Sequence, residues 1–381
     1  MTKNRQHRPT FAQIDLNALA DNFTSVKAFV GDSVKYLAVV KANAYGHGAV
    51  ECSRVLAGLG ADWLGVAIVE EAIELRNAGI TLPILILGSF WPGQEAELLE
   101  HDLTPVIFRL DQATLLEHAA SKLSVTHPYH LKIDTGMGRL GVRPEDVEIF
   151  ARKLAQFTHI RLAGVMTHFA AADDLEQGDF TDHQKTALYS ALEALRRHGH
   201  SPDLIDLANS PASIAYPETR GNMVRLGGVL YGLGGDVLPK GIPTPELKPV
   251  ISLFSEISHL KSVDPGETIG YGRSFTAERK SLIASIPIGY ADGYSRKLSN
   301  VGAVIVNDRY APIIGKISMD WTIIDVTDIP EVEVGSKVVL IGKSDNCAIL
   351  AEDLAGIVDT ISYEITCGIG PRVERRFVDV S

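Results

Sequence analysis

The chain has 381 residues, of which 45% are hydrophobic and 22% charged, a balance typical of a folded globular protein. Its formal net charge of −11 argues against nucleic acid or an anionic membrane surface as the main partner. The three scattered cysteines and the polar N-terminus predict a cytoplasmic protein. The histidines lack metal-ligand spacing, so no metal site is expected, and no apolar run is long enough to predict a membrane span.

The first two-thirds of the chain alternates short apolar runs with longer amphipathic segments. The runs are nearly continuous in apolar residues, which is typical of parallel strands covered on both faces. The eight expected strands are Tyr36–Lys41, Trp63–Ile68, Ile84–Gly88, Thr104–Phe108, Tyr129–Asp134, Leu162–His168, Leu204–Asn209 and Met223–Leu226.

Helical patterns lie between these runs. The clearest are Glu70–Asn77, Asp111–Ala120 with Asp111 as N-cap, Pro144–Phe157 and Phe180–His198. Eight strand–helix units in roughly 210 residues predict a (β/α)8 TIM-type barrel over residues 10–240. A doubly wound open sheet is the competing arrangement, because strand count alone does not separate the two.

A segment rich in glycine and proline, residues 232–249, marks a linker or crossover. The pattern after it changes to short β-type runs separated by turn residues: Val250–Leu260, Ser281–Ile288, Ala303–Val306, Trp321–Val326 and Lys337–Gly342. One helical pattern, Leu350–Ile357, follows these runs. The sequence therefore predicts a second, mostly β domain over residues 241–381.

Polar and cationic side chains stand at five of the predicted strand ends. The carboxyl ends of barrel strands form one rim, where the active sites of such barrels lie. The rim residues are Lys41, Asp134 leading to Arg139, His168, Asn209 with Ser210, and Arg225 with Gly227 and Gly228. Their convergence predicts a functional site at this rim.

Each rim residue has a functional and a structural interpretation. Lys41 is either a strand-end lysine with its ammonium in water or a Schiff-base lysine in a cationic site. Arg225, followed by two glycines, favours a phosphate group. Arg139 suits a substrate carboxylate, or else a loop salt bridge to Asp134. His168, taken alone, is more typical of a structural histidine.

Two segments of the second domain also stand out. Tyr271 lies between two glycines, and Met319 and Asp320 follow a further expected strand, Ala311–Ile317. Without further information, Tyr271 is best interpreted as an aromatic residue of a β-turn.

These segments together resemble the alanine racemase family of fold-type III pyridoxal phosphate (PLP) enzymes, over essentially the whole chain. VVKANAYGHG around Lys41 is similar to that family's cofactor-lysine segment. KIDTGMGRLG, THFA, ANS, MVRLGG, GYG, GYADGY, SMD and ISYEI follow in the family's order, which is far more specific than one motif. The resemblance implies a homodimer with shared active sites that interconverts L- and D-alanine and supplies D-alanine for peptidoglycan.

The resemblance also implies a role for each matching residue. Lys41 would hold PLP and act as one base, and the partner's Tyr271 would be the opposed base. Arg225 would face the pyridine nitrogen, and Arg139 the substrate carboxylate. The other matches would contact the cofactor or complete the partner's site: Tyr45, Ser210, Gly227 and Tyr363 at the phosphate, Asn209 and Gly228 beside them, His168 against the ring, and Met319 and Asp320 from the partner subunit.

Three further positions qualify the resemblance. Lys132 resembles a lysine that is carbamylated in the family, which would supply a negative charge to Arg139. Ser318 stands where many relatives have cysteine, and Gly228 stands where they have a larger apolar residue, which leaves the substrate size limit open.

The alternatives are a broad-specificity or serine-preferring racemase, a PLP-dependent decarboxylase, a non-catalytic PLP-binding barrel and a phosphate-processing barrel without PLP. Tyr363, which narrows the pocket in the alanine enzymes, argues against the serine-preferring relative. The second domain argues against the non-catalytic barrel.

Overall fold

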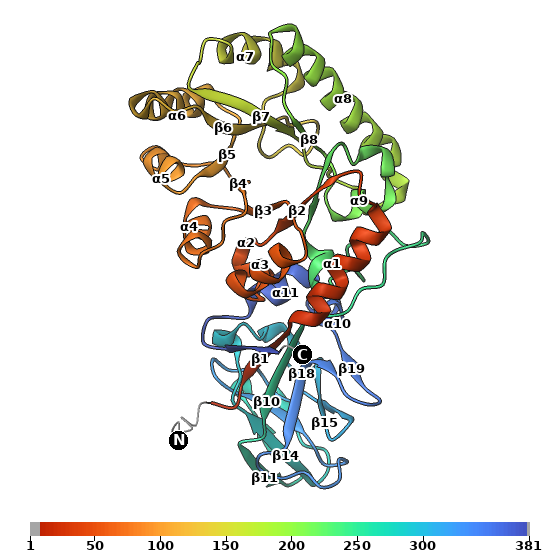
Figure 1. Ribbon diagram of the computed structural model, residues 1–381. Helices are drawn as coiled ribbons and strands as arrows, with labels where there is room; N and C mark the ends of the chain where they lie inside the picture. Colours follow the sequence, from red (N-terminus) through yellow and green to blue (C-terminus); the bar gives the residue numbers. More distant parts are fainter. Residues whose placement is uncertain (1–7, 379–381) are drawn as a thin grey trace.

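The protein, seen here as a computed structural model that describes residues 8–378, has two lobes stacked end to end (Figure 1). The upper lobe in Figure 1 is a closed barrel of eight parallel strands, in which the last strand pairs with the first. This closure confirms the predicted (β/α)8 barrel and rules out the doubly wound sheet, whose edge strands stay open. The barrel strands are β2 (Lys35–Val39), β3 (Trp63–Val66), β4 (Ile84–Ile86), β5 (Leu103–Ile107), β6 (His127–Lys132), β7 (Ile160–Met166), β8 (Leu204–Asp206) and β9 (Met223–Leu226).

Most of the helices of this lobe surround the barrel on its outer face (Figure 1), and the short helices that begin at Lys41 and Ser210 lie at its cavity. The helices are α1 (Leu16–Val30), α2 (Lys41–Tyr45), α3 (Ala49–Gly58), α4 (Val69–Asn77), α5 (Glu95–Glu100), α6 (Leu110–Leu123), α7 (Val147–Leu154), α8 (Gly178–Arg197) and α9 (Ser210–Ala215). The four predicted helices correspond to α4, α6, α7 and α8, with shifted ends. Asp111 was expected to cap α6, but Arg109 is the N-cap, and Asp111 lies in the first turn and pairs with Arg109. The start of the predicted helix before α7, Pro144–Asp146, is a 3-10 turn.

The lower lobe is mostly β structure, as predicted. Its largest sheet has the order β16-β15-β18-β10-β1-β20, with β19 paired to β18, beside sheets β11-β14-β17 and β12-β13. The strands are β1 (Phe11–Asp15), β10 (Ile251–Glu256), β11 (His259–Val263), β12 (Thr268–Ile269), β13 (Phe275–Thr276), β14 (Ser281–Ile286), β15 (Ala303–Val306), β16 (Arg309–Pro312), β17 (Thr322–Asp325), β18 (Lys337–Lys343), β19 (Ala348–Ile349) and β20 (Glu374–Val378). Helices α10 (Ala351–Val358) and α11 (Ser362–Gly368) lie at the junction with the barrel (Figure 1).

The described chain crosses between the lobes after β1 and again in the linker segment 232–249. Strand β1, although it precedes the barrel in sequence, pairs with β10 and β20 in the lower lobe. The domain limits at residues 240 and 241 stay a prediction.

Two β-type runs were wrong in extent. The run Val250–Leu260 is two strands, because the chain leaves the large sheet after Glu256 and enters the three-stranded sheet at His259. The apolar segment 311–317 is a strand only as far as Pro312, where β16 ends. An apolar pattern does not reveal where a strand changes sheets, because that depends on the partner strands.

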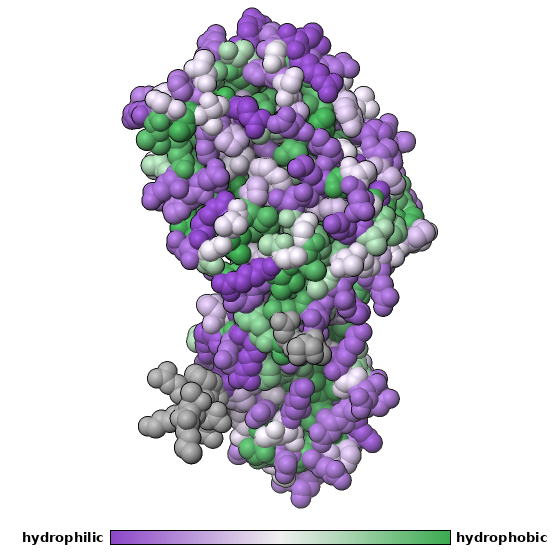
Figure 2. Space-filling view, in the orientation of Figure 1, coloured by the Kyte–Doolittle hydropathy of each residue, from purple (hydrophilic) through white to green (hydrophobic). Residues whose placement is uncertain are grey.

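The surface carries polar and charged side chains on both lobes, with only scattered apolar areas on the face shown in Figure 2. No helix within residues 8–378 has the length and apolar character needed to cross a membrane. The cytoplasmic location stays a prediction.

Two fully buried histidines make the fold sensitive to acid. Burial lowers the pKa of His47 to about 4 and that of His130 to about 3. Both ring nitrogens of His130 lack a hydrogen-bond partner among the described residues. Both side chains are therefore neutral in the folded protein well below the ordinary histidine pKa of 6.5.

We expect the free energy of unfolding to fall as the pH is lowered from 6.5 toward 4, because the unfolded chain then binds protons that the buried histidines do not. Between pH 6.5 and 5 each histidine contributes roughly 2 kcal/mol to this loss. His130→Leu should remove that share of the pH dependence, whereas His118→Leu, on the exposed side of α6, should not. Urea unfolding at pH 7 and pH 5 measures both, and an unaltered pH dependence in His130→Leu would contradict this account.

Candidate active site

A cavity of about 710 Å³ lies at the carboxyl ends of the barrel strands. Its lining includes residues from β2, β6 and β9, from the loops that follow β7 and β8, and from α11. It brings together eleven of the predicted site residues: Lys41, Tyr45, Lys132, Arg139, His168, Asn209, Ser210, Arg225, Gly227, Gly228 and Tyr363.

Lys41 was expected to end its strand. Instead, β2 stops at Val39, and Lys41 begins α2 two residues later. The four residues after it, 42–45, have φ angles between 52° and 54°, so they form a left-handed helical turn without glycine. Each L-residue in this conformation costs roughly 1–2 kcal/mol. The surrounding contacts must therefore hold the turn in place.

Hydrogen bonds at both ends of this turn supply that hold. At its start, the N–H of Ala42 donates to Glu71 Oε1 at 2.6 Å. At its end, Gly48 N donates to Asn43 O at 2.9 Å, and Ala49 N donates to the Asn43 side-chain oxygen at 2.8 Å. The segment is fixed from two sides, which fixes the direction in which Lys41 leaves the backbone.

The two cavity lysines lose their protons more readily than a lysine in water. Burial lowers the pKa of Lys41, and Arg139 and Arg225 lower it further. Burial, Arg225 and Arg139 lower the pKa of Lys132 to about 8. A lysine in such surroundings is a better nucleophile and base near neutral pH.

Arg225 is almost fully buried at the end of β9 and is held by several acceptors. It pairs with the buried carboxylate of Asp206 and donates to Thr167 O at 2.9 Å and to His168 Nδ1 at 3.1 Å. Because a guanidinium only donates, His168 Nδ1 accepts and the ring proton is on Nε2. Burial, then Arg225 and Lys132, lowers the pKa of His168 to about 2, so the ring is neutral.

Asp206 is a site residue that the sequence interpretation missed. It is the last residue of β8, which lies next to β9, and its side chain is fully buried. The sequence did contain a signal for Asp206, because an acidic residue within the apolar run 204–208 needs a buried cationic partner. Arg225, the third residue of the neighbouring strand, is such a partner.

Hydroxyl groups surround the backbone of Gly227 and Gly228. Gly227 N donates to Ser210 Oγ at 2.9 Å. A Cβ atom at Gly227 would lie 2.6 Å from Tyr45 Oη, and one at Gly228 would lie 2.3 Å from Tyr363 Oη. Glycine is therefore required at both positions by the close approach of a tyrosine.

Tyr363 reaches this recess because α11 is anchored on two sides. Asp236, in the linker, accepts from Ser362 N at 2.6 Å and from Ser362 Oγ at 2.7 Å, at the start of the helix. A Cβ atom at Gly46 would lie 2.1 Å from Thr366 O, so the glycine lets the lysine segment pack directly on α11.

We expect Gly228→Ala to destabilise the protein by roughly 1–3 kcal/mol, because the added methyl group overlaps the ring of Tyr363. Gly356→Ala is the matched control, since Gly356 is exposed within α10 and a Cβ there meets no atom within 4 Å. That control should stabilise the protein by about 0.5–1 kcal/mol. Urea unfolding separates the two signs, and equal stability of Gly228→Ala and the wild type would contradict the overlap.

Arg139 has no ion pair with any residue of the described range 8–378. Asp134, its expected loop partner, instead accepts from Gly136 N at 3.2 Å and Gly138 N at 2.9 Å. Arg139 thus lines the cavity with its guanidinium available for an anionic ligand. Asn209, by contrast, caps α9 by accepting from Ala212 N at 3.2 Å.

Three predicted site residues do not line the cavity of this chain. Tyr271 and Met319 lie on the lower lobe and are 68% and 52% exposed. Asp320 accepts from Arg372 Nη2 at 2.7 Å. One chain therefore does not unite Tyr271 with Lys41.

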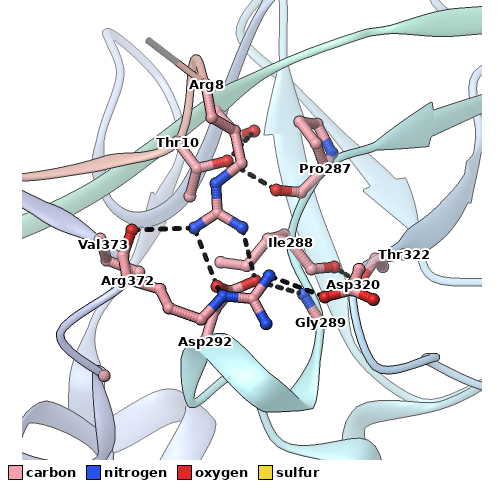
Figure 3. Close-up of polar contacts among 12 residues, drawn as sticks. Arg8, Thr10, Pro287, Ile288, Gly289, Asp292, Asp320, Thr322, Arg372 and Val373 are labelled. Atoms are coloured by element: carbon pink, nitrogen blue, oxygen red, sulfur yellow. Dashed lines mark hydrogen bonds and ion pairs between the residues drawn. The ribbon is translucent and has the colours of Figure 1, made fainter.

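An ion-pair network holds the segment that carries Met319 and Asp320 (Figure 3). Asp292 is buried and pairs with Arg8 at 2.8 Å and with Arg372 at 3.3 Å, and Arg372 also binds Asp320. The network ties the two ends of the described chain to this exposed face.

The chain matches the family model for the alanine racemase N-terminal domain over residues 14–234 and that for the C-terminal domain over residues 250–377. The alanine racemase of Halothermothrix orenii is 44% identical over 372 residues, which cover 97% of both chains.

Solved structures agree with this match. An alanine racemase from Bacillus anthracis with bound L-Ala-P gives a TM-score of 0.91 at 35% identity, covering 98% of this chain and 96% of that one. The Bartonella henselae alanine racemase with covalently bound pyridoxal phosphate gives 0.88 at 29% identity, covering 98% and 100%. The two family models together cover both lobes of the protein. The chain therefore belongs to the alanine racemase family.

Proposed function

We propose that this protein interconverts L- and D-alanine with PLP as its cofactor and so supplies D-alanine for peptidoglycan. The observation that carries the proposal is one cavity that joins a lysine of lowered pKa, two arginines and a recess of hydroxyl and backbone N–H groups. The relatives named above are alanine racemases, and the Bartonella henselae protein carries covalently bound pyridoxal phosphate.

The residues present fit a phosphorylated aldehyde. The amine of Lys41 would bind the aldehyde carbon, and the recess at Gly227 and Gly228, where the absence of side chains lets two tyrosines approach, would hold the phosphate with Ser210. Tyr45 and Tyr363 would add hydroxyl groups, with Asn209 beside them. When bound, PLP withdraws electrons from the substrate Cα and makes its proton more acidic.

Arg225 would set how far this activation goes. A guanidinium facing the pyridine nitrogen cannot accept a proton and leaves that nitrogen unprotonated. Activation is then moderate, which favours return of the proton to Cα over loss of the amino group. Asp206 and His168 hold Arg225 in one orientation.

Racemisation needs a proton removed on one face of Cα and returned on the other. We propose that Lys41 serves one face and the partner's Tyr271 the other, in a homodimer with shared sites. The exposure of Tyr271 leaves it available to a second chain. The partner's Met319 and the partner's Asp320 would complete the same site, and Arg139 would hold the substrate carboxylate.

Lys132 is proposed to carry a carbamate. An amine with a pKa of about 8 has a sizeable unprotonated fraction at neutral pH, and that form adds CO₂ with release of a proton. The product would place a negative charge near Arg139 and Arg225. A ¹³C carbamate resonance in protein equilibrated with ¹³C-bicarbonate, absent from Lys132→Ala, is the expected result; no such resonance in the wild type would contradict the proposal.

The test of the function itself uses purified protein with added PLP. We expect a visible absorbance band from the lysine-linked cofactor and conversion of pure L-alanine to an equal mixture of enantiomers, followed by chiral chromatography. L-serine should react more slowly, because Tyr363 fills space beside Gly228. Colourless protein that leaves L-alanine optically unchanged would refute the function.

A further inference from the structure

We propose that Glu71 is a positioning residue for Lys41, because its carboxylate joins the turn behind the lysine to the neighbouring strand end. This inference rests on the proposed role of Lys41, but Glu71 itself does not line the cavity formed by the described residues. It stands in the first turn of α4 and is half-buried.

The carboxylate of Glu71 accepts three backbone N–H groups from two loops. Oε1 accepts from Ala42 at 2.6 Å, and Oε2 accepts from Ala67 at 2.7 Å and from Ile68 at 3.4 Å. Ala42 follows Lys41 directly, and Ala67 follows β3, the strand that pairs with β2. Because Ala42 and Ala67 both line the cavity, one side chain ties together two adjacent parts of its rim.

The Ala42 N–H has a particular need for this acceptor. The first N–H groups of a helical turn have no partner within the turn. Here the turn is left-handed over four residues other than glycine, so its own backbone favours another conformation. A hydrogen bond to a carboxylate is about twice as strong as one to a neutral acceptor, which suits a strained segment.

The charge of Glu71 also acts on Lys41. The neighbouring guanidinium groups of Arg139 and Arg225 lower the pKa of Lys41, whereas Glu71 raises it. Loss of the Glu71 charge should therefore make a positive charge on the Lys41 nitrogen less stable. Glu71 thus holds the lysine in place and moderates its acidity.

Three variants separate these effects. Glu71→Ala removes the acceptor and the charge, and Glu71→Gln keeps one carbonyl acceptor but removes the charge. Glu74→Gln is the control, because it removes the same charge one turn along α4, where the side chain is exposed and has no hydrogen bond within residues 8–378.

Amide hydrogen exchange of the holoenzyme gives the first readout. We expect segment 42–48 to exchange at least about tenfold faster in Glu71→Ala, with Glu71→Gln between it and the wild type, and no change in Glu74→Gln. Should Glu71→Ala fail to fold, the comparison of Glu71→Gln with Glu74→Gln decides. Exchange rates equal to those of the wild type in the Glu71 variants overturn the proposal.

The second readout is the pH titration of the visible absorbance of the lysine-linked cofactor. Its midpoint should move to lower pH in Glu71→Gln but not in Glu74→Gln, with kcat reduced more than KM is changed. An unmoved midpoint overturns the electrostatic part. If the wild-type protein fails to racemise alanine, the proposed function fails, while the exchange experiment still decides the role of Glu71.

Discussion

Lys41→Ala is expected to lose the visible absorbance of the lysine-linked cofactor and to lose alanine racemisation by about a thousandfold or more. The variant lacks the amine that we propose binds the aldehyde and serves as the base on one face of Cα, and a positioned base alone contributes roughly 10²–10⁴-fold. Among the described residues the cavity is lined by one other lysine, Lys132, but that lysine ends β6 and is not followed by a left-handed turn like the one after Lys41. Absorbance and chiral chromatography of the same preparation measure both losses.

The matched control is Lys35→Ala, at the start of β2, which removes one lysine charge without touching the cavity. It should keep both the absorbance and the activity. Added methylamine should restore part of the proton transfer in Lys41→Ala, because a small amine can enter the space that the side chain leaves. Wild-type absorbance and turnover in Lys41→Ala would show that another residue holds the cofactor.

Tyr271→Phe should lower kcat/KM for alanine by roughly 10²–10⁴-fold in both directions, because it removes the base that we propose for the second face. The two enantiomers are equally stable in solution, so the two values of kcat/KM must fall together. The variant should still exchange the α-proton of one enantiomer with solvent deuterium through Lys41. Exchange without inversion is therefore its expected signature, measured by NMR in D₂O with each enantiomer.

Tyr310→Phe provides the control for this variant, since Tyr310 is another exposed tyrosine of the lower lobe. It should racemise alanine at the wild-type rate. If Tyr271→Phe racemised equally well, or exchanged neither enantiomer, Tyr271 would not be the second base.

The barrel and its rim could be predicted because their signals are local. Buried parallel strands appear as continuous apolar runs, and their carboxyl ends share one rim, so Lys41, His168 and Arg225 could be expected together. The lysine turn could not, because a left-handed conformation at Ala42 and Ala44 has no signature in alanine residues.

Other features depend on tertiary or quaternary partners. The run Val250–Leu260 divides because its two halves pair in different sheets. The contact of Asp206 with Arg225 joins strands that are distant in sequence, although the isolated acid in an apolar run was a usable hint. Tyr271 gives no local sign of a role in another chain's site, and only the resemblance to a family suggested one.

We propose that the two opposed bases come from different chains, and a mixed dimer tests this most directly. Lys41→Ala and Tyr271→Phe chains with different tags would be produced together, and the heterodimer purified through both tags. It holds one site with both bases intact, so we predict about half the wild-type turnover per dimer. A heterodimer no more active than either parent variant would contradict the claim.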